Sequence, residues 1–233
     1  MERLDKILAH MGFGTRREVK QLIKSGAVSV NGSIAADADL KIDPNADELC
    51  VNGKTVRYRK YIYLMLNKPQ GFISATFDKR HRTVAELVPP ELAHTEPFPV
   101  GRLDIDTEGL LIMTNDGDLA HRALSPKNHI SKVYYAELDA DFDEGDIEAF
   151  RDGIIIDGGY KTLPAVLERE GGGARVTIYE GKFHQIKQMF ERRGKNVTYL
   201  KRVQMGGLPL DETLEPGEIR EITEEELDSL WKK

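Results

Sequence analysis

The densest group of side chains that could do chemistry lies near the middle of the chain. It reads Gly101-Arg102-Leu103-Asp104-Ile105-Asp106-Thr107-Glu108-Gly109-Leu110, so three carboxylates lie two residues apart beside an arginine. In an extended segment Arg102 and Asp104 would share a face, with Leu103 turned the other way. A carboxylate held beside a cation stays ionised, which suits it to act as a base or a nucleophile.

A calcium loop and a solvated turn are the other interpretations of this segment. The alternating acids and Gly109 imitate the start of an EF-hand loop, but Asn115 stands where that loop requires a bidentate glutamate. The six histidines are scattered and there is one cysteine, so no zinc-binding pattern is present. A surface turn in which Asp106 or Thr107 caps local backbone groups stays open as an alternative.

A second group of polar and basic residues follows a Gly turn. It reads Glu180-Gly181-Lys182-Phe183-His184-Gln185-Ile186-Lys187-Gln188-Met189. We expect a helix over residues 183–193, with Phe183, Ile186 and Phe190 on one face, and an ordinary core-facing helix is the alternative to a functional one. If the fold brings Lys187 opposite Asp104, its ammonium would keep that carboxylate charged and oriented.

The third group is Lys132-Val133-Tyr134-Tyr135, which reads as a strand. Alternation places Lys132 and Tyr134 on one face and Tyr135 on the other. One tyrosine is expected in the core. The other is then available to stack on an unpaired base, a contact worth roughly 1–3 kcal/mol.

Composition indicates an ordinary globular protein. The 233 residues suffice for one large domain or two small ones, with 31% charged and 40% hydrophobic residues. We see neither signal-peptide character at the start nor an apolar stretch long enough for a membrane span, and the lone Cys50 suits a reducing compartment. We therefore expect a cytoplasmic protein that does not enter membranes.

The net charge of -6 argues against a nucleic-acid partner, but the distribution of charge along the chain favours one. Residues 211–233 hold nine acids and three bases, whereas residues 182–202 hold seven bases and one acid. Local patches decide where a polyanion docks, so the basic segment is a candidate contact region.

Residues 1–32 read as a compact unit with two helices and a strand. Thr15-Arg16-Arg17-Glu18 is a capping-box pattern that opens the second helix. Arg16, Lys20 and Lys24 recur every four residues, with Arg17 alongside, and form a basic stripe that is either a solvated face or a phosphate-binding surface. With Arg3-Leu4-Asp5-Lys6 and Gly26-Ala27-Val28-Ser29-Val30-Asn31-Gly32, this region resembles the S4 RNA-binding domain.

The rest of the chain alternates short strands and helices without a βαβ rhythm, which favours an α+β fold. We place the domain boundary near residue 60, so that 1–60 form the S4-like α/β domain and linker and 61–233 form the second domain. Strands are expected at 61–66, 133–138, 154–156, 166–168 and 174–179, and helices near 84–87, 117–124, 143–152, 183–193 and 224–231.

Residues 61–233 resemble the catalytic domain of pseudouridine synthases, and of the bacterial small-subunit ribosomal RNA type in particular. The matching pieces are Met65-Leu66-Asn67-Lys68-Pro69-Gln70-Gly71, Gly101 to Thr107, Ser125-Pro126-Lys127, Lys132-Val133-Tyr134, Glu180 to Lys187, and Leu214-Glu215-Pro216-Gly217-Glu218. The resemblance implies a mixed, largely antiparallel sheet flanked by helices.

The resemblance also implies roles for individual residues. By it, Asp104 is the catalytic residue, Tyr134 lies against the target uracil, and Lys187 pairs with the catalytic aspartate. Arg102 and Ile186 are expected to contact the extruded nucleotide. Arg16, Arg17, Lys20, Lys24 and Lys132 are assigned to RNA binding.

The implied reaction converts uridine to pseudouridine at a single site in small-subunit ribosomal RNA, without a cofactor or a metal. A large-subunit ribosomal RNA pseudouridine synthase and a non-catalytic S4-domain assembly factor are the alternatives. The expected partner is ribosomal RNA. We expect a monomer, because no heptad pattern or long apolar edge suggests self-association.

Overall fold

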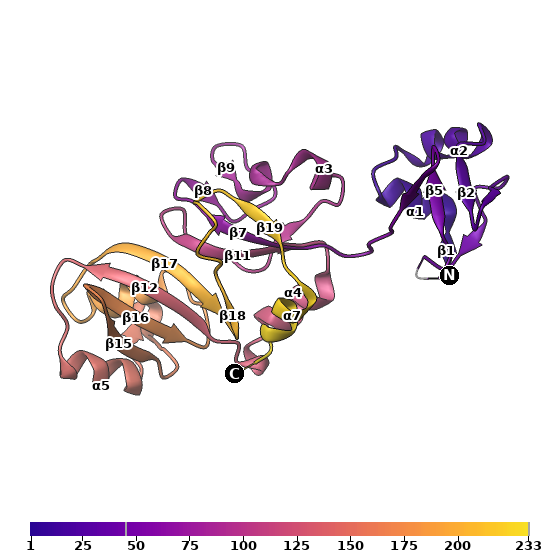
Figure 1. The fold of residues 1–233 in the computed structure, drawn as a ribbon. Coiled ribbons are helices and arrows are strands. Elements are labelled where there is room, and N and C mark those ends of the chain that lie inside the picture. The colour runs from indigo at the N-terminus through magenta and orange to yellow at the C-terminus, as the bar shows by residue number, and fades with distance from the viewer. Residues whose placement is uncertain (45, 233) are drawn as a thin grey trace. The chain divides into compact units, whose positions relative to one another are not determined.

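The computed structural model describes residues 1–44 and 46–232 and divides the chain into two compact units (Figure 1). The first unit contains Met1–Ile62 and Pro89–Glu96, and the second contains Tyr63–Val88 and Pro97–Lys233. Each unit has its own hydrophobic core, as expected of parts of the chain that pack independently.

In the first unit, two helices pack on a small antiparallel sheet. The helices are α1 (Leu4–His10) and α2 (Arg16–Lys24), and the sheet has the order β3-β2-β5-β6. The remaining bounds are β2 Val28–Val30, β3 Ser33–Ile34, β5 Leu49–Val51, β6 Lys54–Val56, and a separate pair, β1 Glu2–Arg3 with β4 Lys41–Ile42; the short α3 (Pro90–Ala93) belongs to the same unit.

The predicted capping box at the start of α2 is confirmed. Thr15 Oγ1 accepts a hydrogen bond from the Glu18 amide at 3.3 Å, and a carboxylate oxygen of Glu18 accepts one from the Thr15 amide at 2.7 Å. Val19 and Ile23 turn the apolar side of the helix into the core. The opposite side is free to carry the basic stripe.

The second unit is built on a nine-stranded sheet of order β15-β16-β12-β17-β11-β7-β19, with β10 beside β11 and β18 beside β17. The strands are β7 Tyr63–Lys68, β10 Phe98–Pro99, β11 Glu108–Thr114, β12 Lys132–Leu138, β15 Val166–Glu170, β16 Gly173–Ile178, β17 Val197–Met205, β18 Leu208–Pro209 and β19 Ile219–Glu221. Two short pairs lie outside the sheet: β8 Phe72–Ile73 with β9 Arg82–Thr83, and β13 Ile155–Ile156 with β14 Tyr160–Lys161.

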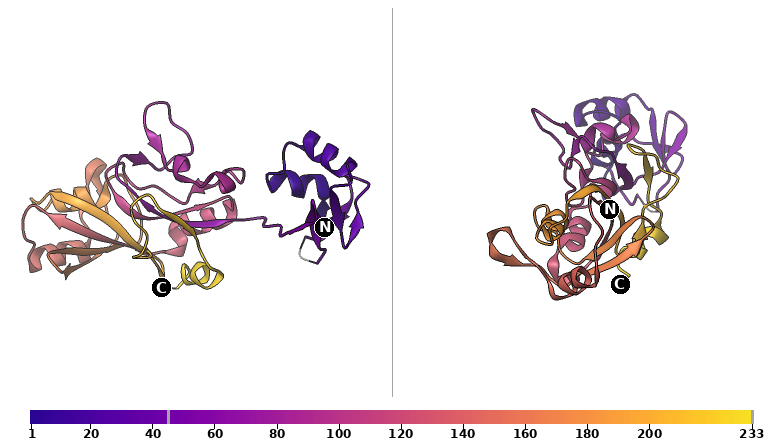
Figure 2. Two further views of the ribbon diagram at one scale, coloured as in Figure 1. Left: turned by 45° about the horizontal axis from the view of Figure 1, so that its top comes forward. Right: turned by 90° about the vertical axis from the view of Figure 1, so that its left-hand side faces the viewer.

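One junction joins the two halves of this sheet. β11 and β17 run parallel and pair over two positions, Glu108 with Lys201 and Gly109 with Arg202, whereas the other neighbouring strands of the sheet are antiparallel. The continuity of the sheet across this junction can be followed in Figures 1 and 2. The predicted α+β fold with a mixed, largely antiparallel sheet is confirmed.

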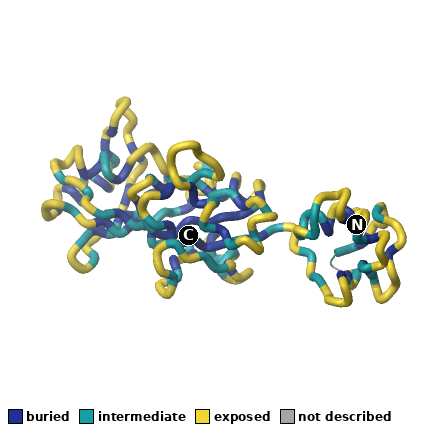
Figure 3. The backbone as a smooth tube through the Cα atoms, turned by 90° about the horizontal axis from the view of Figure 1, so that it is seen from above, coloured by how far each residue is buried: buried dark blue, intermediate teal, exposed yellow. Residues whose placement is uncertain are grey.

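Each half of the sheet is covered by its own helices. α4 (Gly117–Leu124) and α7 (Glu224–Ser229) lie with the β7–β11 half, whose core includes Met65, Leu110 and Ile112. α5 (Glu144–Asp152) and α6 (Gln185–Glu191) lie with the other half, where the rings of Phe150 and Phe190 are 4.8 Å apart. The sheet strands are mostly buried and the connecting loops exposed (Figure 3).

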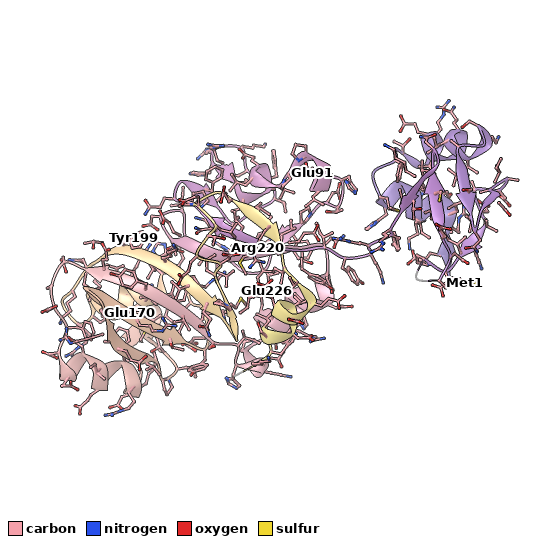
Figure 4. All side chains as sticks on the ribbon, in the orientation of Figure 1. Met1, Glu91, Glu170, Tyr199, Arg220 and Glu226 are labelled. Carbon is pink, nitrogen blue, oxygen red and sulfur yellow. The ribbon has the colours of Figure 1, made fainter. Side chains whose placement is uncertain are left out.

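The C-terminal helix is tied to the sheet by ion pairs. Arg220 on β19 contacts Glu226 on α7 at 2.7 Å and Asp211 at 2.6 Å, and Figure 4 labels the first two residues. Hydrogen bonds from Arg220 lower the pKa of the Glu226 carboxyl to about 2. This pairing fixes the segment that closes the β7–β11 core.

Several predicted elements differ from the observed ones. The segment 84–87 is a 3-10 helix, and α6 begins at Gln185, two residues after the predicted start. The sequence analysis did not identify β17, the longest strand of the sheet. Of the helices that the structure describes, none combines the length and apolar character needed to cross a membrane.

Candidate active site

A buried lysine shapes the loop that carries Asp104. Lys68, the last residue of β7, is fully buried, and its ammonium donates to the carbonyls of Asp104, Pro69 and Thr107 at 2.9–3.0 Å. Burial lowers the pKa of Lys68 to about 8, and Asp106 and Asp104 oppose that shift. The ammonium therefore supplies hydrogen bonds to loop carbonyl groups that would otherwise lack a backbone N–H donor, because the loop is irregular.

Side-chain and backbone contacts from the following segment hold the other edge of the loop. Ser74 Oγ accepts from the Leu103 amide at 2.9 Å and donates to the Leu103 carbonyl at 3.0 Å. The Gly71 amide donates to the Ile105 carbonyl at 2.8 Å. With Leu103 buried below, the intervening Asp104 side chain is turned out of the core.

The carboxylate of Asp104 lies against α6. Lys187 Nζ is 3.2 Å from Asp104 Oδ2, and His184 Nε2 is 3.7 Å from Oδ1. The Asp104 side chain is 29% exposed, so it remains accessible to a ligand. This places a carboxylate with a cationic partner at the edge of a pocket, the arrangement expected of a catalytic base or nucleophile.

Lys187 also contacts a second carboxylate of the same loop. Its ammonium is 2.6 Å from Asp106 Oδ1, closer than it is to Asp104. Partial burial raises the pKa of Asp106, but the hydrogen bond from Lys187 and the charge of its ammonium, with smaller local contributions, together lower the pKa overall. Asp106, which the sequence analysis assigned to a turn, is therefore a partner of the same lysine.

The turn before α6 sets the direction of Lys187. His184 has a left-handed backbone (φ 48°) and is the N-cap of α6. Gln185 then fixes the turn, because its Oε1 accepts from the Lys182 amide at 2.9 Å and its Nε2 donates to Glu180 at 3.2 Å. Lys187 follows in the first turn of the helix, on the side facing Asp104.

Phe183 does not share a helix face with Ile186 and Phe190, as the expected helix over residues 183–193 would have it. Phe183 precedes the helix and is 71% exposed, and its ring stacks on His184 with centroids 3.8 Å apart. Because His184 has a left-handed backbone conformation and α6 begins only at Gln185, Phe183 lies outside the helix and the helical spacing of side chains does not apply to it. Ile186 and Phe190 are buried as predicted.

A pocket of about 220 Å³ opens beside the Asp104 carboxylate. Tyr134 from β12 and Ile186 from α6 both line it and are largely buried. The full lining is Arg102, Leu103, Asp104, Thr107, Tyr134, Ile178, Gly181, Lys182, Phe183, His184, Gln185, Ile186, Lys187 and Leu200. A tyrosine ring and an aliphatic side chain in one small pocket suit a planar ring such as a nucleobase.

The other predicted site residues are distributed over three places. Arg102 lines the pocket but is exposed. Among the described residues, Lys187 forms an ion pair with Asp104 and the His184 ring lies 3.7 Å from it, so the guanidinium expected beside the Asp104 carboxylate is not the cation that contacts it. Lys132 lines a neighbouring hollow. Arg16, Arg17, Lys20 and Lys24 are exposed on α2 of the first unit.

Arg202, on β17 at the sheet junction, is a site residue that the sequence analysis did not identify. It is 2% exposed, and its Nε donates to the Leu110 carbonyl at 2.7 Å. The strands approach closely there because Gly109 has φ +99°, and a Cβ at that position would lie 2.2 Å from the Arg202 carbonyl oxygen. No local pattern in the sequence marks Arg202, because its place opposite Tyr134 depends on the pairing of β12 with β17.

The described residues contain no group of three or more His, Cys, Asp or Glu side chains placed to hold a metal ion. The space between Asp104 and Asp106, which the calcium interpretation would fill with a cation, is occupied by the Lys187 ammonium.

Family models match both units of the chain. Residues 62–192 match the RNA pseudouridylate synthase model, and residues 2–48 match the S4 domain model. Among solved structures, a crystal structure of a pseudouridylate synthase is 36% identical with a TM-score of 0.70, over 99% of this chain and 100% of that one.

Curated relatives match over nearly the full length. The RNA pseudouridine synthase YtzG of Bacillus subtilis is 52% identical over 97% of this chain and 96% of its own. The ribosomal small subunit pseudouridine synthase A of Escherichia coli is 38% identical over 98% of this chain and 99% of its own. The ribosomal large subunit pseudouridine synthase B of Bacillus subtilis is 36% identical over 99% of this chain and 96% of its own. The chain therefore belongs to the RNA pseudouridine synthase family, with an S4 domain preceding the synthase domain.

Proposed function

We propose that this enzyme isomerises a uridine of small-subunit ribosomal RNA and that Asp104 is its catalytic residue. The observation that carries the proposal is the position of the Asp104 carboxylate, which lines the pocket and is ion-paired to Lys187 at 3.2 Å. Tyr134 and Ile186 line the same pocket, where they can contact a uracil ring.

The reaction rearranges one nucleotide without changing its atomic composition. The N1–C1′ bond breaks, the uracil turns, and C5 bonds to C1′; the C5 hydrogen leaves as a proton and N1 gains one. Asp104 acts either as a nucleophile on C1′ or as a base that removes a sugar proton. Both roles use the ionised carboxylate, which Lys187 orients and whose charge it balances.

The pocket accepts a base only when the base has left its stack. A pocket of about 220 Å³ lined by buried Tyr134 and Ile186 has room for a single extruded ring and none for a paired duplex. We therefore expect the target uridine in a loop or in RNA that opens easily. The exposed basic residues on α2 supply a second contact with the phosphate backbone.

The preference for small-subunit RNA depends on a local pattern. The small-subunit and large-subunit relatives are almost equally similar to this chain. Ser125-Pro126-Lys127 with His129 is more typical of the small-subunit type. A large-subunit target is the second candidate, and the S4 match and the full-length relatives support ribosomal RNA as the partner in either case.

Tritium release tests both parts of the proposal. Because the reaction removes the C5 hydrogen, RNA made with [5-³H]uridine releases tritium when it is isomerised. We expect wild-type protein to release tritium from small-subunit RNA and not from large-subunit RNA. Release from large-subunit RNA alone would reverse the choice of substrate.

Two isosteric variants separate catalysis from charge. Asp104→Asn and Asp106→Asn each remove one carboxylate from Lys187, but Asp104 lines the pocket and Asp106 does not. We expect Asp104→Asn to abolish release and Asp106→Asn to keep most of it. If Asp104→Asn released as much tritium as Asp106→Asn, with both variants active, Asp104 would have no part in the mechanism.

The remaining expectations concern the setting of the enzyme. We expect it to act in the cytoplasm as a monomer. Size-exclusion chromatography with light scattering, at the concentration used for the activity assay, checks the monomer, and a dimer mass would contradict it.

A further inference from the structure

A second hollow opens beside the pocket of about 220 Å³ next to Asp104, which we call the uridine pocket. It has a volume of about 600 Å³ and shares Arg102, Tyr134, Gly181 and Lys182 with that pocket. The residues specific to it include Lys132, Tyr160, Tyr179, Glu180 and Arg202. A chain whose one nucleotide occupies the first pocket would therefore continue directly over the second.

Strand register places a buried cation, Arg202, and a partly buried one, Lys132, in this hollow. Tyr134 on β12 pairs directly with Arg202 on β17, and Lys132 precedes Tyr134 by two residues, next to a register shift between Val133 and Tyr134. All three side chains line the hollow. Arg202 is 2% exposed, and its Nη2 has no hydrogen-bond partner among the residues that the structure describes. The Lys132 ammonium donates to the Ile130 carbonyl at 3.2 Å.

The electrostatics of the two cations are unbalanced. Burial and the positive charge of Arg202 together lower the pKa of Lys132 to about 8, and the charge of the Glu180 carboxylate only partly opposes this shift. A buried charge without a counterion is strongly unfavourable, and an unpartnered guanidinium nitrogen adds to that cost. An anion bound between the two side chains would relieve both effects.

The acidic residue that lines the hollow is already engaged elsewhere. The Glu180 carboxylate accepts from the Tyr160 hydroxyl at 2.6 Å, from the Leu163 amide at 2.8 Å and from Gln185 Nε2 at 3.2 Å. It forms no ion pair with Lys132 or Arg202. The hollow is therefore preformed with a net positive lining.

We propose that Lys132 and Arg202 form a subsite for one backbone phosphate of the substrate RNA, next to the nucleotide in the uridine pocket. The subsite rests on the proposed function, because its ligand is the RNA that the pocket receives. Arginine and lysine are the usual phosphate ligands, and the exposed rings of Tyr160 and Tyr179 at the rim suit stacking on a neighbouring base.

Binding is measured in the Asp104→Asn background, so that the RNA is not converted. The probe is a labelled small-subunit ribosomal RNA fragment. The variants are Lys132→Met and, as a matched control, Lys232→Met, which removes an exposed lysine that lines neither of the two hollows. We expect Lys132→Met to weaken binding about tenfold, as for a lost hydrogen bond to a charged group, and Lys232→Met to change it little.

Ethylation interference identifies the contact as a phosphate. RNA ethylated at one phosphate per molecule is separated into bound and free fractions, and ethylation neutralises the modified phosphate. We expect ethylation of a phosphate adjacent to the modified uridine to interfere with binding to the Asp104→Asn protein, and to interfere less when the protein also carries Lys132→Met, because only Arg202 then remains to bind that phosphate. Arg202→Lys, which keeps the charge but loses the fork of donors, should weaken the same interference.

Equal affinity of the Lys132→Met and Lys232→Met proteins would overturn the subsite, and so would an unchanged interference pattern. Tryptophan fluorescence of Trp231 in each variant shows that the second unit is folded. Tritium release by the wild type is measured in parallel. Its absence would overturn the proposed function, whereas the binding measurements judge the phosphate subsite separately.

Discussion

Replacing Gly109 by alanine tests whether the close approach of β11 to β17 holds the active-site loop in place. The backbone at Gly109 has φ +99°, a region that costs an L-residue about 1–2 kcal/mol. The new Cβ would also lie 2.2 Å from the Arg202 carbonyl oxygen, and overpacking of this kind costs about 1–3 kcal/mol. Together these predict a loss of about 2–5 kcal/mol in the free energy of unfolding.

Gly194→Ala is the matched control for this variant. Gly194 lies in the same unit with φ +71°, but a Cβ there would meet no atom within 4 Å, so only the backbone cost of about 1–2 kcal/mol applies. Urea unfolding is followed through Trp231, the single tryptophan, which packs on the core of the second unit. We expect Gly109→Ala to unfold at a clearly lower urea concentration than Gly194→Ala, and coincident midpoints would refute the argument.

The same variant carries an expectation for activity. Separation of the two strands displaces the start of β11, to which the Asp104 loop is joined. We therefore expect the isomerisation rate of Gly109→Ala to fall by a larger factor than its affinity for RNA. A variant that is destabilised but turns over RNA at the wild-type rate would show that the loop is held by Lys68 and Ser74 without the strand contact.

Three further predictions concern ion pairs and charge. Lys187→Met should lower the isomerisation rate about 100-fold, because the carboxylate of Asp104 loses its orienting partner; single-turnover kinetics measures this, and RNA affinity should hardly change. Burial raises the pKa of Asp146, but hydrogen bonds from Lys195 and its other donors lower it overall to about 2. The ionised Asp146 carboxylate therefore contributes about 2 kcal/mol of stability at neutral pH. That contribution is lost as the pH falls from about 4 through 2. In urea unfolding, Asp146→Asn should therefore be less stable than wild type at pH 7, with the difference shrinking below pH 4; a constant difference would contradict this. The double variant of Arg17 and Lys20 to alanine should bind RNA more weakly and reduce the slope of log affinity against log salt by about 1–2, with the rate at saturating RNA unchanged.

Motifs with local physical causes were predictable from the sequence. The capping box of α2 depends on residues three apart, and the strand at Lys132–Leu138 shows regular alternation. The shared face of Lys132 and Tyr134 was also predictable, because residues two apart in a strand point to the same side. Family resemblance supplied the pairing of Asp104 with Lys187, which lie far apart in the chain.

Features that depend on long-range contacts were not predictable in this way. β17 was missed because Lys201 and Arg202 interrupt its apolar pattern. The burial of Arg202 depends on the strands and loops that pack around it at the hollow, which are distant from it in the sequence. The start of α6 was misplaced because His184 adopts a left-handed conformation, which side-chain periodicity does not reveal. The second partner of Lys187, Asp106, depends on how the loop folds over Lys68.

The parallel junction between β11 and β17 also decides when the active site can form. Asp104 precedes β11, whereas β17 is among the last strands to be made, and the two meet over only two residue pairs. A nascent chain that has been synthesised through α6 already contains both Asp104 and Lys187 but lacks the strand that joins the two halves of the sheet. We therefore expect catalytic competence only after β17 has been made, so that the topology of the sheet would keep an incomplete chain from acting on RNA.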